Sequence, residues 1–235
     1  MNLMKKYIAI LVATFILVSI TSGCTKKKST EIIAIKSANI GDIVKYGKYE
    51  QDNIAANGKE IISWRVLAFE NGKALLISEK IIDVMLYNEE YRTVTWETCN
   101  LRSWLNVTFF DSAFSATEKL SVATTKLIND DNPEYKTPGG NDTNDKVFLL
   151  SLYEADKYFT NDNARAATVT DFAKINGISF GKKNNYLGNG YWWLRSPGNN
   201  SLNAEIVYFD GYIGSYFYDV YNTYVGVRPA IWVNL

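Results

Sequence analysis

The fold is decided by Trp192-Trp193-Leu194-Arg195-Ser196-Pro197-Gly198 and by Gly226-Val227-Arg228-Pro229-Ala230-Ile231-Trp232. Each stretch is a short run of apolar and aromatic residues interrupted by glycine and proline, a composition that is typical of short buried strands. From residue 191 to residue 235 the sequence therefore predicts short strands separated by glycines.

One arginine lies inside each of these two stretches, Arg195 in the first and Arg228 in the second. Two interpretations of these arginines are open. Their guanidinium groups could clamp a carboxylate or sulfate ligand, or they could hold neighbouring loops. We favour the second interpretation, because buried charges in proteins are paired. We expect both arginines to donate hydrogen bonds to backbone carbonyls or to an acid.

The sequence before these stretches begins with strand patterns. Apolar residues dominate 43–46, 61–69 and 74–78. The turn Glu70-Asn71-Gly72-Lys73 lies between the last two runs, and both Asn and Gly tolerate the positive φ that a type I′ turn requires. The sequence therefore predicts a β-hairpin at 61–78.

Helix patterns follow the hairpin. Residues 96–114 show a helical period. Capping boxes at Ser115-Ala116-Thr117-Glu118 and Ser151-Leu152-Tyr153-Glu154 open two further helices, the second one after a buried strand at 147–150. Between these helices lies a loop rich in Pro, Gly, Asn and Asp, 129–145. Strands, then helices, then strands indicate an α+β fold of short antiparallel strands with a few helices.

Together with upstream segments in the same order, the two deciding stretches resemble the bacterial family designated domain of unknown function 6273, over nearly all of 41–235. More distantly, Trp-Leu-Arg-Ser and Gly-Val-Arg-Pro are similar to segments of the C-type-lectin-like fold, which formylglycine-generating enzymes and retroelement-diversified proteins share. The resemblance implies a single C-type-lectin-like domain at 41–235 with a binding face, and it implies no established activity. The upstream segments are Trp64-Arg65-Val66-Leu67, Ala74-Leu75-Leu76-Ile77-Ser78, Trp96-Glu97-Thr98-Cys99-Asn100-Leu101-Arg102-Ser103-Trp104-Leu105-Asn106 and Lys146-Val147-Phe148-Leu149-Leu150-Ser151.

The amino terminus predicts a lipoprotein. Two lysines precede an uncharged apolar run at 7–23, which ends in small residues directly before Cys24. A cysteine at the first mature position resembles the bacterial lipobox, in which diacylglycerol is attached to the thiol. We expect a signal peptide at 1–23, a lipidated Cys24 that begins a flexible basic tether at 24–40, and a body outside the cell membrane. The alternative is an uncleaved anchor, since the apolar run almost spans a bilayer of about 30 Å.

The composition excludes several classes of catalytic site, metal site and disulfide scaffold. The chain has no histidine and only two cysteines, Cys24 and Cys99, which removes Ser-His-Asp triads, Cys-His dyads, histidine-ligated zinc and an internal disulfide scaffold. Six of the 25 basic residues and one of the 25 acidic residues precede Ala38, which leaves 19 basic and 24 acidic residues in the body. A body with a net negative charge does not favour phosphate backbones, so we expect no nucleic acid partner.

A tyrosine-rich segment lies near the carboxyl end, where eight of the 18 positions between 207 and 224 are aromatic. In an extended segment, even-numbered residues project to one side. Tyrosine with Asp and Asn suits recognition, because its ring offers a large contact area and a hydroxyl group at low entropy cost. Ordinary strand packing is the alternative, since tyrosine is also a favoured strand residue. The predicted ligand-binding residues are Tyr208, Asp210, Tyr212, Tyr216, Tyr218, Tyr221, Asn222 and Tyr224.

We predict no cofactor, although two loops contain the oxygen ligands that calcium prefers. These loops are Asp130-Asp131-Asn132-Pro133-Glu134 and Asn141-Asp142-Thr143-Asn144-Asp145. Solvated loop chemistry explains them equally well, since neither matches the EF-hand spacing. The resemblance to formylglycine-generating enzymes implies a pair of active-site cysteines. This chain does not supply that pair, because Cys24 is assigned to the lipid and Cys99 lies on an apolar helix, where a thiol is usually inert.

We therefore expect a lipid-anchored, surface-exposed ligand-binding module and not an enzyme. Its partners would be the membrane, through the lipid, and an extracellular protein or glycan. Tyr, Asp, Asn and Ser are also the residues that adenine-directed mutagenesis of Asn codons leaves, so a retroelement-diversified variable protein is a further hypothesis. Two alternatives stay open: a carbohydrate-active cell-envelope enzyme with carboxylate catalysis, and a structural envelope lipoprotein.

Overall fold

The hairpin predicted around Asn71-Gly72 is present and begins the first sheet. The computed structural model describes residues 30–181, 186–214 and 217–235. In it, β2 (Glu60–Glu70) and β3 (Lys73–Ser78) pair in an antiparallel manner. The two turn residues have φ of 50° and 72°, which are the positive values that a type I′ turn requires.

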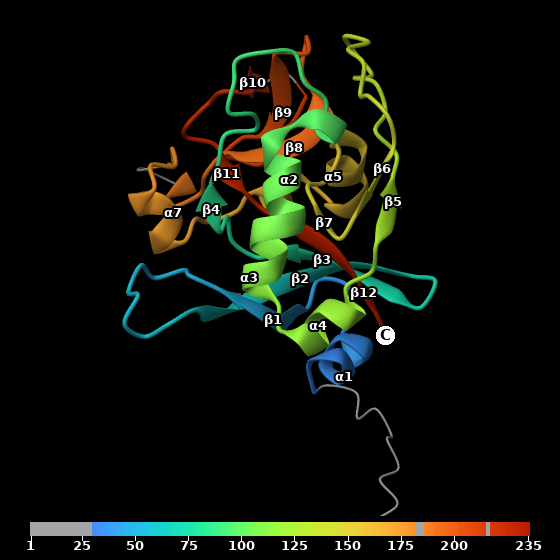
Figure 1. Ribbon diagram of the computed structural model, residues 1–235, viewed down its shortest axis with the longest axis vertical. Coiled ribbons are helices and arrows are strands. Elements are labelled where there is room, and N and C mark those ends of the chain that lie inside the picture. The colour runs from blue at the N-terminus through green and yellow to red at the C-terminus, as the bar shows by residue number, and fades with distance from the viewer. Residues whose placement is uncertain (1–29, 182–185, 215–216) are drawn as a thin grey trace, which may run out of the picture.

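The first sheet has five strands in the order β1-β2-β3-β12-β7, and every neighbouring pair is antiparallel. Its last strand in the sequence therefore lies inside the sheet, between β3 and β7. Figure 1 shows this sheet in the lower half of the molecule. The strands not yet given are β1 (Ile43–Tyr49), β7 (Val147–Phe148) and β12 (Ala230–Asn234).

The second sheet lies above the first in Figure 1 and has the order β10-β9-β8-β11-β4. Its pairs are antiparallel except β8 with β11, which are parallel. A separate ribbon joins β5 (Thr125–Leu127) to β6 (Thr143–Asp145). The α+β class is confirmed. The strands of the second sheet are β4 (Asp83–Val84), β8 (Trp192–Pro197), β9 (Asn203–Val207), β10 (Phe217–Asp219) and β11 (Gly226–Val227).

Helices form where the sequence predicts them. The helical stretch predicted at 96–114 is built from four consecutive elements that run from the level of the second sheet down to the first (Figure 1). Both predicted capping boxes are present, with Ser115 and Glu118 at α4 and with Ser151 and Glu154 at α5. The helices are η1 (Trp96–Thr98), α2 (Asn100–Trp104), η2 (Leu105–Phe109), α3 (Phe110–Ala113), α4 (Ala116–Ser121), α5 (Leu152–Tyr158), α6 (Asp162–Arg165) and α7 (Asp171–Ile175).

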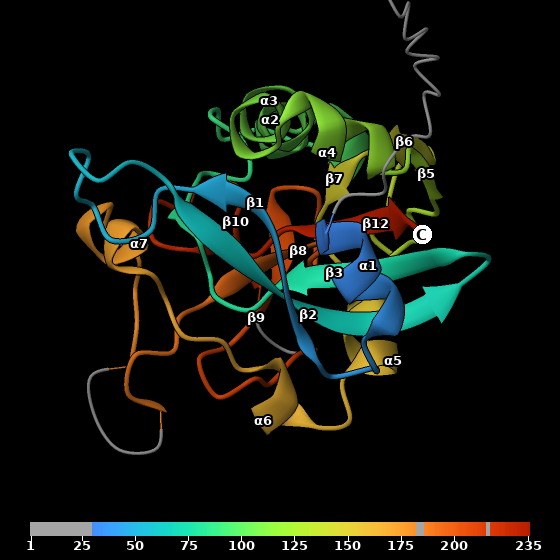
Figure 2. The ribbon, with the colours of Figure 1, turned by 90° about the horizontal axis from the view of Figure 1, so that it is seen from below.

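The structured body begins earlier than residue 41. Residues Thr30–Ser37 form α1, which lies over the outer face of the first sheet (Figure 2). The expectation of a flexible tether at 24–40 is therefore wrong for residues Thr30–Ser37, which are helical. The physical reason is Ile35, which is fully buried in the core, so the segment gains more from burying apolar surface than from staying extended. The expected signal peptide at 1–23 and Cys24 lie outside the described residues.

Membrane-spanning helices were searched over the described residues. None of the helices in this part of the chain has the length and apolar character needed to cross a bilayer.

One hydrophobic core extends across both sheets. Its largest side chains include Trp64, Trp96, Trp192 and Trp193, all of them fully buried. Three of these indoles donate to a partner: Trp64 to the Tyr46 carbonyl, Trp96 to Asp145 and Trp193 to the Met85 carbonyl. Buried indole N–H groups need such acceptors, so these bonds fix the ring orientations.

Gly47 gives a test of how α3 is packed against β1. Its φ is +67°, and a Cβ built there would lie 2.7 Å from the Phe114 ring and 2.8 Å from the Ala113 carbonyl oxygen. We predict that Gly47→Ala lowers the free energy of unfolding by about 2 kcal/mol or more in urea titrations. Gly58→Ala is the matched control, because Gly58 also has a positive φ, +81°, but open space around it. Equal losses in both variants would mean that the Phe114 contact contributes nothing.

Candidate functional site

The tyrosine-rich segment lies along the second sheet, but it is not extended. The prediction that its even-numbered residues project to one side requires an extended segment. The amide of Gly211 donates to the Tyr208 carbonyl, and the amide of Tyr208 donates to the Tyr212 carbonyl. Gly211 and Gly214 have φ of 89° and 109°, so the chain turns at both positions. Even-numbered residues of this segment therefore do not share one face. Tyr216 lies outside the described residues.

Four tyrosine rings meet beside β8, and we call Tyr191, Tyr208, Tyr218 and Tyr224 the tyrosine cluster. Ring centroids are 4.6 Å apart for Tyr191 and Tyr208, 5.9 Å for Tyr191 and Tyr218, and 5.5 Å for Tyr218 and Tyr224. Each of these three pairs has an edge-to-face geometry, which the ring quadrupole favours. The structure thus brings together three of the predicted residues and adds Tyr191, which the sequence analysis missed.

Burial and a neighbouring phenol raise the pKa of two tyrosines of the cluster, Tyr191 and Tyr218. Burial, together with the Tyr208 hydroxyl, raises the pKa of Tyr191 to about 12. The same causes raise the pKa of Tyr218. These hydroxyl groups therefore keep their protons at physiological pH and can both donate and accept hydrogen bonds.

Two further predicted tyrosines, Tyr212 and Tyr221, lie in the same segment, and Tyr224 is the most exposed member of the tyrosine cluster. Tyr212 is 39% exposed, Tyr221 is 50% exposed and Tyr224 is 39% exposed. The two predicted polar residues shape the loops, since Asp210 accepts from the Tyr212 amide and Asn222 accepts from the Tyr224 amide, both at 3.0 Å. The tyrosine-rich segment thus combines two half-buried rings, Tyr208 and Tyr218, with the more exposed Tyr212, Tyr221 and Tyr224.

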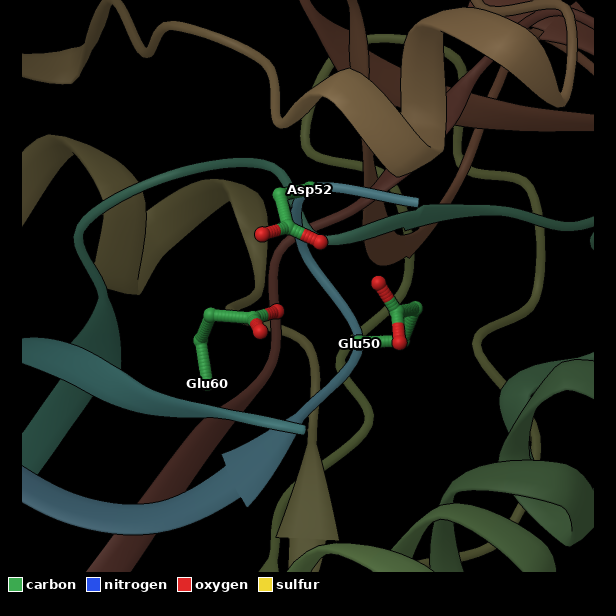
Figure 3. Close-up of side chains that lie close together, drawn as sticks. All are labelled: Glu50, Asp52 and Glu60. Carbon is green, nitrogen blue, oxygen red and sulfur yellow. The ribbon is translucent and has the colours of Figure 1, made fainter. Parts of the chain in front are cut away.

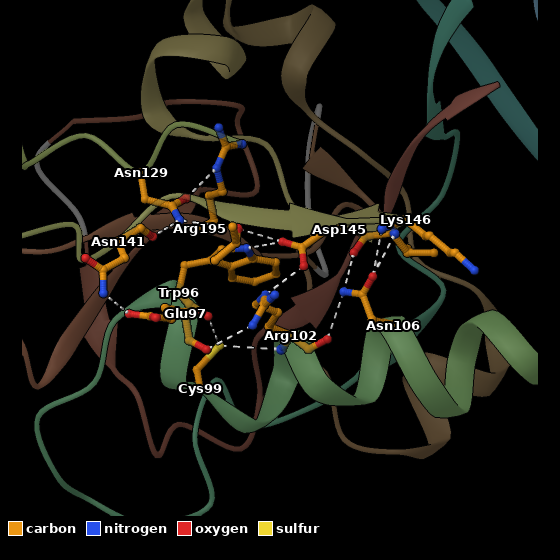
Figure 4. A network of polar contacts seen from close by, with 12 residues as sticks. Trp96, Glu97, Cys99, Arg102, Asn106, Asn129, Asn141, Asp145, Lys146 and Arg195 are labelled. Carbon is orange, nitrogen blue, oxygen red and sulfur yellow. Dashed lines mark hydrogen bonds and ion pairs between the residues drawn. The ribbon is translucent and has the colours of Figure 1, made fainter. Parts of the chain in front are cut away.

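Arg195 holds loops, as the sequence analysis favoured. Its guanidinium group is buried, and it donates to the Leu149 and Ile128 carbonyls at 2.9 and 3.2 Å. It also donates to Asn129 Oδ1 at 3.2 Å (Figure 4) and pairs with the Glu154 carboxylate. Each nitrogen of this guanidinium group thus donates to a partner within the protein itself.

Arg228 is also buried and donates to the Ser78 and Arg165 carbonyls at 2.9 and 2.8 Å. Its guanidinium carbon lies 5.0 Å from the centre of the Trp192 ring, a geometry that favours a cation over an aromatic face. The prediction that this arginine would hold loops through backbone carbonyls is confirmed.

The Asn/Asp-rich loop between β5 and β6 is pinned to the core through buried polar side chains. Asp145 is 1% exposed and accepts from Trp96 Nε1 at 2.9 Å and from Arg102 Nε at 2.7 Å (Figure 4). Asn106 binds the same segment, with its Oδ1 accepting from the Lys146 amide at 2.8 Å. These polar residues of the 96–106 motif therefore serve to fasten the loop.

Three of the five carboxylates in the two loops expected to favour calcium are engaged within the protein. Asp131 accepts from the Gly139 amide, Asp142 pairs with Lys126 and Asp145 pairs with Arg102. Each of these contacts uses an oxygen that a calcium ion would need.

A group of three carboxylates that could hold a metal ion lies elsewhere among the described residues. The oxygens of Glu50, Asp52 and Glu60 lie within 4.8 Å of one another (Figure 3). The pairing of Tyr49 with Glu60 brings both ends of the β1–β2 loop together, which explains the juxtaposition. The sequence analysis missed this group, although the hairpin-like pairing of the two strands was the available signal.

Cys99 is buried, as predicted, and lies at the N-cap of α2. Its sulfur accepts from the Arg102 amide and donates to the Trp96 carbonyl, both at 3.4 Å. Burial raises the pKa of the thiol to about 12. The thiolate, which is the reactive form, is therefore scarce at physiological pH.

Glu205 is a buried acid that the sequence analysis did not single out. It lies in β9 and is fully buried. Its Oε1 accepts from Asn132 Nδ2 at 2.9 Å, and Asn132 also donates to the Pro197 carbonyl. Its Oε2 has no hydrogen-bond partner within the described residues. Burial is the main cause that raises the pKa of Glu205 to about 7.

The fold and the tyrosine cluster define an α+β domain with an aromatic surface along its second sheet. The family model described as Domain of unknown function (DUF6273) matches residues 71–235, and the chain belongs to this family. The match includes the tyrosine-rich segment and begins after β2, later than the resemblance over 41–235 predicted. No curated protein and no solved structure matches the chain.

The raised pKa of Glu205 predicts that the stability of the fold depends on pH. An acid whose pKa rises on folding stabilises the folded state at low pH, and that contribution is lost as the pH rises from the ordinary value of 4.5 to the folded value of about 7. We predict that Glu205→Gln, which stays neutral, is more stable than the natural chain at pH 8 by on the order of 3 kcal/mol and equally stable near pH 4.5. Urea unfolding at a series of pH values measures this difference. The exposed Glu89→Gln is the control, and parallel pH curves for the natural chain and Glu205→Gln would contradict the prediction.

Arg195 generates a stability prediction. Replacing it by methionine leaves Glu154 and the Leu149 and Ile128 carbonyls without their donor. We predict a loss of about 3 kcal/mol in the free energy of unfolding. Arg92→Met is the control, because Arg92 forms an exposed ion pair with Glu90, and such pairs contribute little. A loss for Arg195→Met as small as that for the control would show that the buried network does not stabilise the fold.

Proposed function

We propose that the chain is a lipid-anchored binding module outside the cell membrane, and that its tyrosine-rich surface contacts a protein or glycan ligand. One observation carries the proposal: the rings of the tyrosine cluster pack edge to face, its member Tyr224 is 39% exposed, and Tyr212 and Tyr221 of the same segment are 39 and 50% exposed. Singly scattered exposed rings would need no explanation, whereas exposed rings in one segment with a packed aromatic cluster suit recognition.

The packing of the cluster favours tight binding. Because Tyr208 and Tyr218 are held by edge contacts with Tyr191, they lose little side-chain entropy when a ligand binds. Tyrosine hydroxyl groups can donate hydrogen bonds to, or accept them from, either a backbone or a sugar. This combination supports a ligand with many hydrogen-bonding groups.

The arrangement of the elements supports the anchored orientation. α1 lies at the end of the molecule opposite β10, the strand that carries Tyr218 (Figure 1). A lipid on Cys24, a few residues before α1, would therefore hold the first sheet toward the membrane. The tyrosine-rich surface would then face away from it.

The proposal extends to the fold family. We infer a C-type-lectin-like fold from the Trp-Leu-Arg-Ser and Gly-Val-Arg-Pro segments, which lie on the neighbouring strands β8 and β11. The exposed loop residues between β9 and β11 are also where a retroelement-diversified protein would vary. A genome that lacks both a neighbouring reverse transcriptase and a repeat of this segment that differs at adenines would remove the hypothesis of diversification.

The proposed function is tested by replacing Tyr212, Tyr221 and Tyr224 together by alanine. We expect the variant to lose binding to the ligands that the natural chain captures on glycan and surface-protein arrays. Its melting temperature should fall by only a few degrees, because these rings are partly exposed. Tyr91→Ala, at a tyrosine outside the segment that is 59% exposed, should bind as the natural chain does. Retained binding by the triple variant would refute the proposal, and a large loss of stability would identify the rings as core.

A further inference from the structure

A groove lies beside the first sheet, between the tip of the β2–β3 hairpin, β5 and α5. Its volume is about 440 Å³, which is within the range of small-molecule sites. None of the predicted tyrosine-rich residues lines it. The groove is therefore a second candidate site, independent of the tyrosine cluster.

The groove forms because two neighbouring segments diverge. The amide of Ala123 donates to the Trp232 carbonyl, and Val122 bridges to Val233, so the chain first runs beside β12. It then leaves β12 as β5 and pairs only with β6, and Figure 1 shows β5 rising away from β12. Trp232 lines the space opened between them.

Four basic and three acidic side chains line the groove, and most of them are ion-paired. Arg195 pairs with Glu154, and Lys157 lies 3.6 Å from Glu70. Lys126 pairs at 3.0 Å with Asp142, which lies outside the lining. Two lining charges make no ion pair among the described residues, Lys73 and Asp130, and they have opposite signs. When Asp142 is counted with its partner Lys126, the charges at the groove sum to zero, so the groove does not favour phosphate groups or polyanions.

Aromatic faces alternate with these polar groups. Tyr153 is 69% exposed at the rim on α5, and Tyr158 and Trp232 are half-buried in the lining. Such rings offer flat apolar surfaces, and Tyr158 also offers a hydroxyl group, while Ser151 and Thr125 supply hydroxyl groups nearby. The groove thus combines ring platforms with donors and acceptors of both kinds.

We propose that this groove binds a neutral saccharide. A sugar ring presents C–H groups on its faces, which pack against aromatic rings, and hydroxyl groups around its edge, which both donate and accept. The faces would pack on Tyr153 and Trp232, and the hydroxyl groups would reach Lys73 and Asp130. A lipid tail would leave these charges without water or partners, at a high cost in free energy.

The test uses the full chain in a detergent without a sugar head group. Chitotetraose, cellotetraose and maltotetraose are titrated by calorimetry, with trigalacturonate as an anionic comparison. We expect at least one neutral tetrasaccharide to bind, and Tyr153→Ala to weaken it about tenfold. Asp130→Asn should weaken it several-fold. Tyr153 makes no polar contact that the fold needs, so its variant should melt as the natural chain does.

Tyr221→Ala is the matched control, since Tyr221 is an exposed tyrosine of the tyrosine-rich surface. Unchanged saccharide affinity in this variant supports the groove. A loss in Tyr221→Ala without a loss in Tyr153→Ala would place the sugar on the other surface and overturn the inference while leaving the proposed function intact. Tighter binding of trigalacturonate, or no binding of any neutral probe up to about 10 mM, would also overturn it.

Discussion

The buried guanidinium group of Arg195 is the constraint on which the rest of the structure depends. It lies in β8 of the second sheet and donates to the Leu149 carbonyl, directly after β7 of the first sheet. The same group binds the Ile128 carbonyl after β5 and the Glu154 carboxylate of α5. A buried charge is tolerated only when its partners are all present. The positions of both sheets, the ribbon and α5 are therefore coupled through one side chain.

Arg228 connects β3 and α6, and it has no carboxylate ion-pair partner within the part of the chain that the structure describes. It binds the Ser78 carbonyl at the end of β3 and the Arg165 carbonyl of α6, and it stacks over Trp192 and Phe159. Burial lowers the pKa of Arg228 to about 9. Carbonyl dipoles and aromatic faces thus hold this charge, and they fix the junction between β11 and β12, from which the last strand enters the first sheet.

Sequence reasoning predicted the structure correctly where a feature depends on a few neighbouring residues. It failed where a feature depends on contacts between segments that are distant in the sequence. The Asn71-Gly72 turn and the two capping boxes follow from backbone preferences within four residues. The insertion of β12 between β3 and β7, and the meeting of Tyr191 with Tyr208 and Tyr218, depend on which strands become neighbours. Gly211 shows the limit most clearly. A Cβ there would lie 1.7 Å from the Asp162 carbonyl oxygen, a contact that no local pattern in the sequence reveals.

The contacts of Arg195 and Arg228 also explain why the exposed loop residues can change at little cost in stability. Tyr221 and Tyr224 lie between β10 and β11, and the buried contacts of Arg195 and Arg228 involve neither of them. Asp210 and Asn222 shape their own loops through backbone amides two residues away, so those loops need no support from the exposed rings. Loops carried on a rigid scaffold can change their side chains at little cost in stability. In this molecule charges buried in the core secure the scaffold, so the proposed recognition can depend on the loops without loss of the fold.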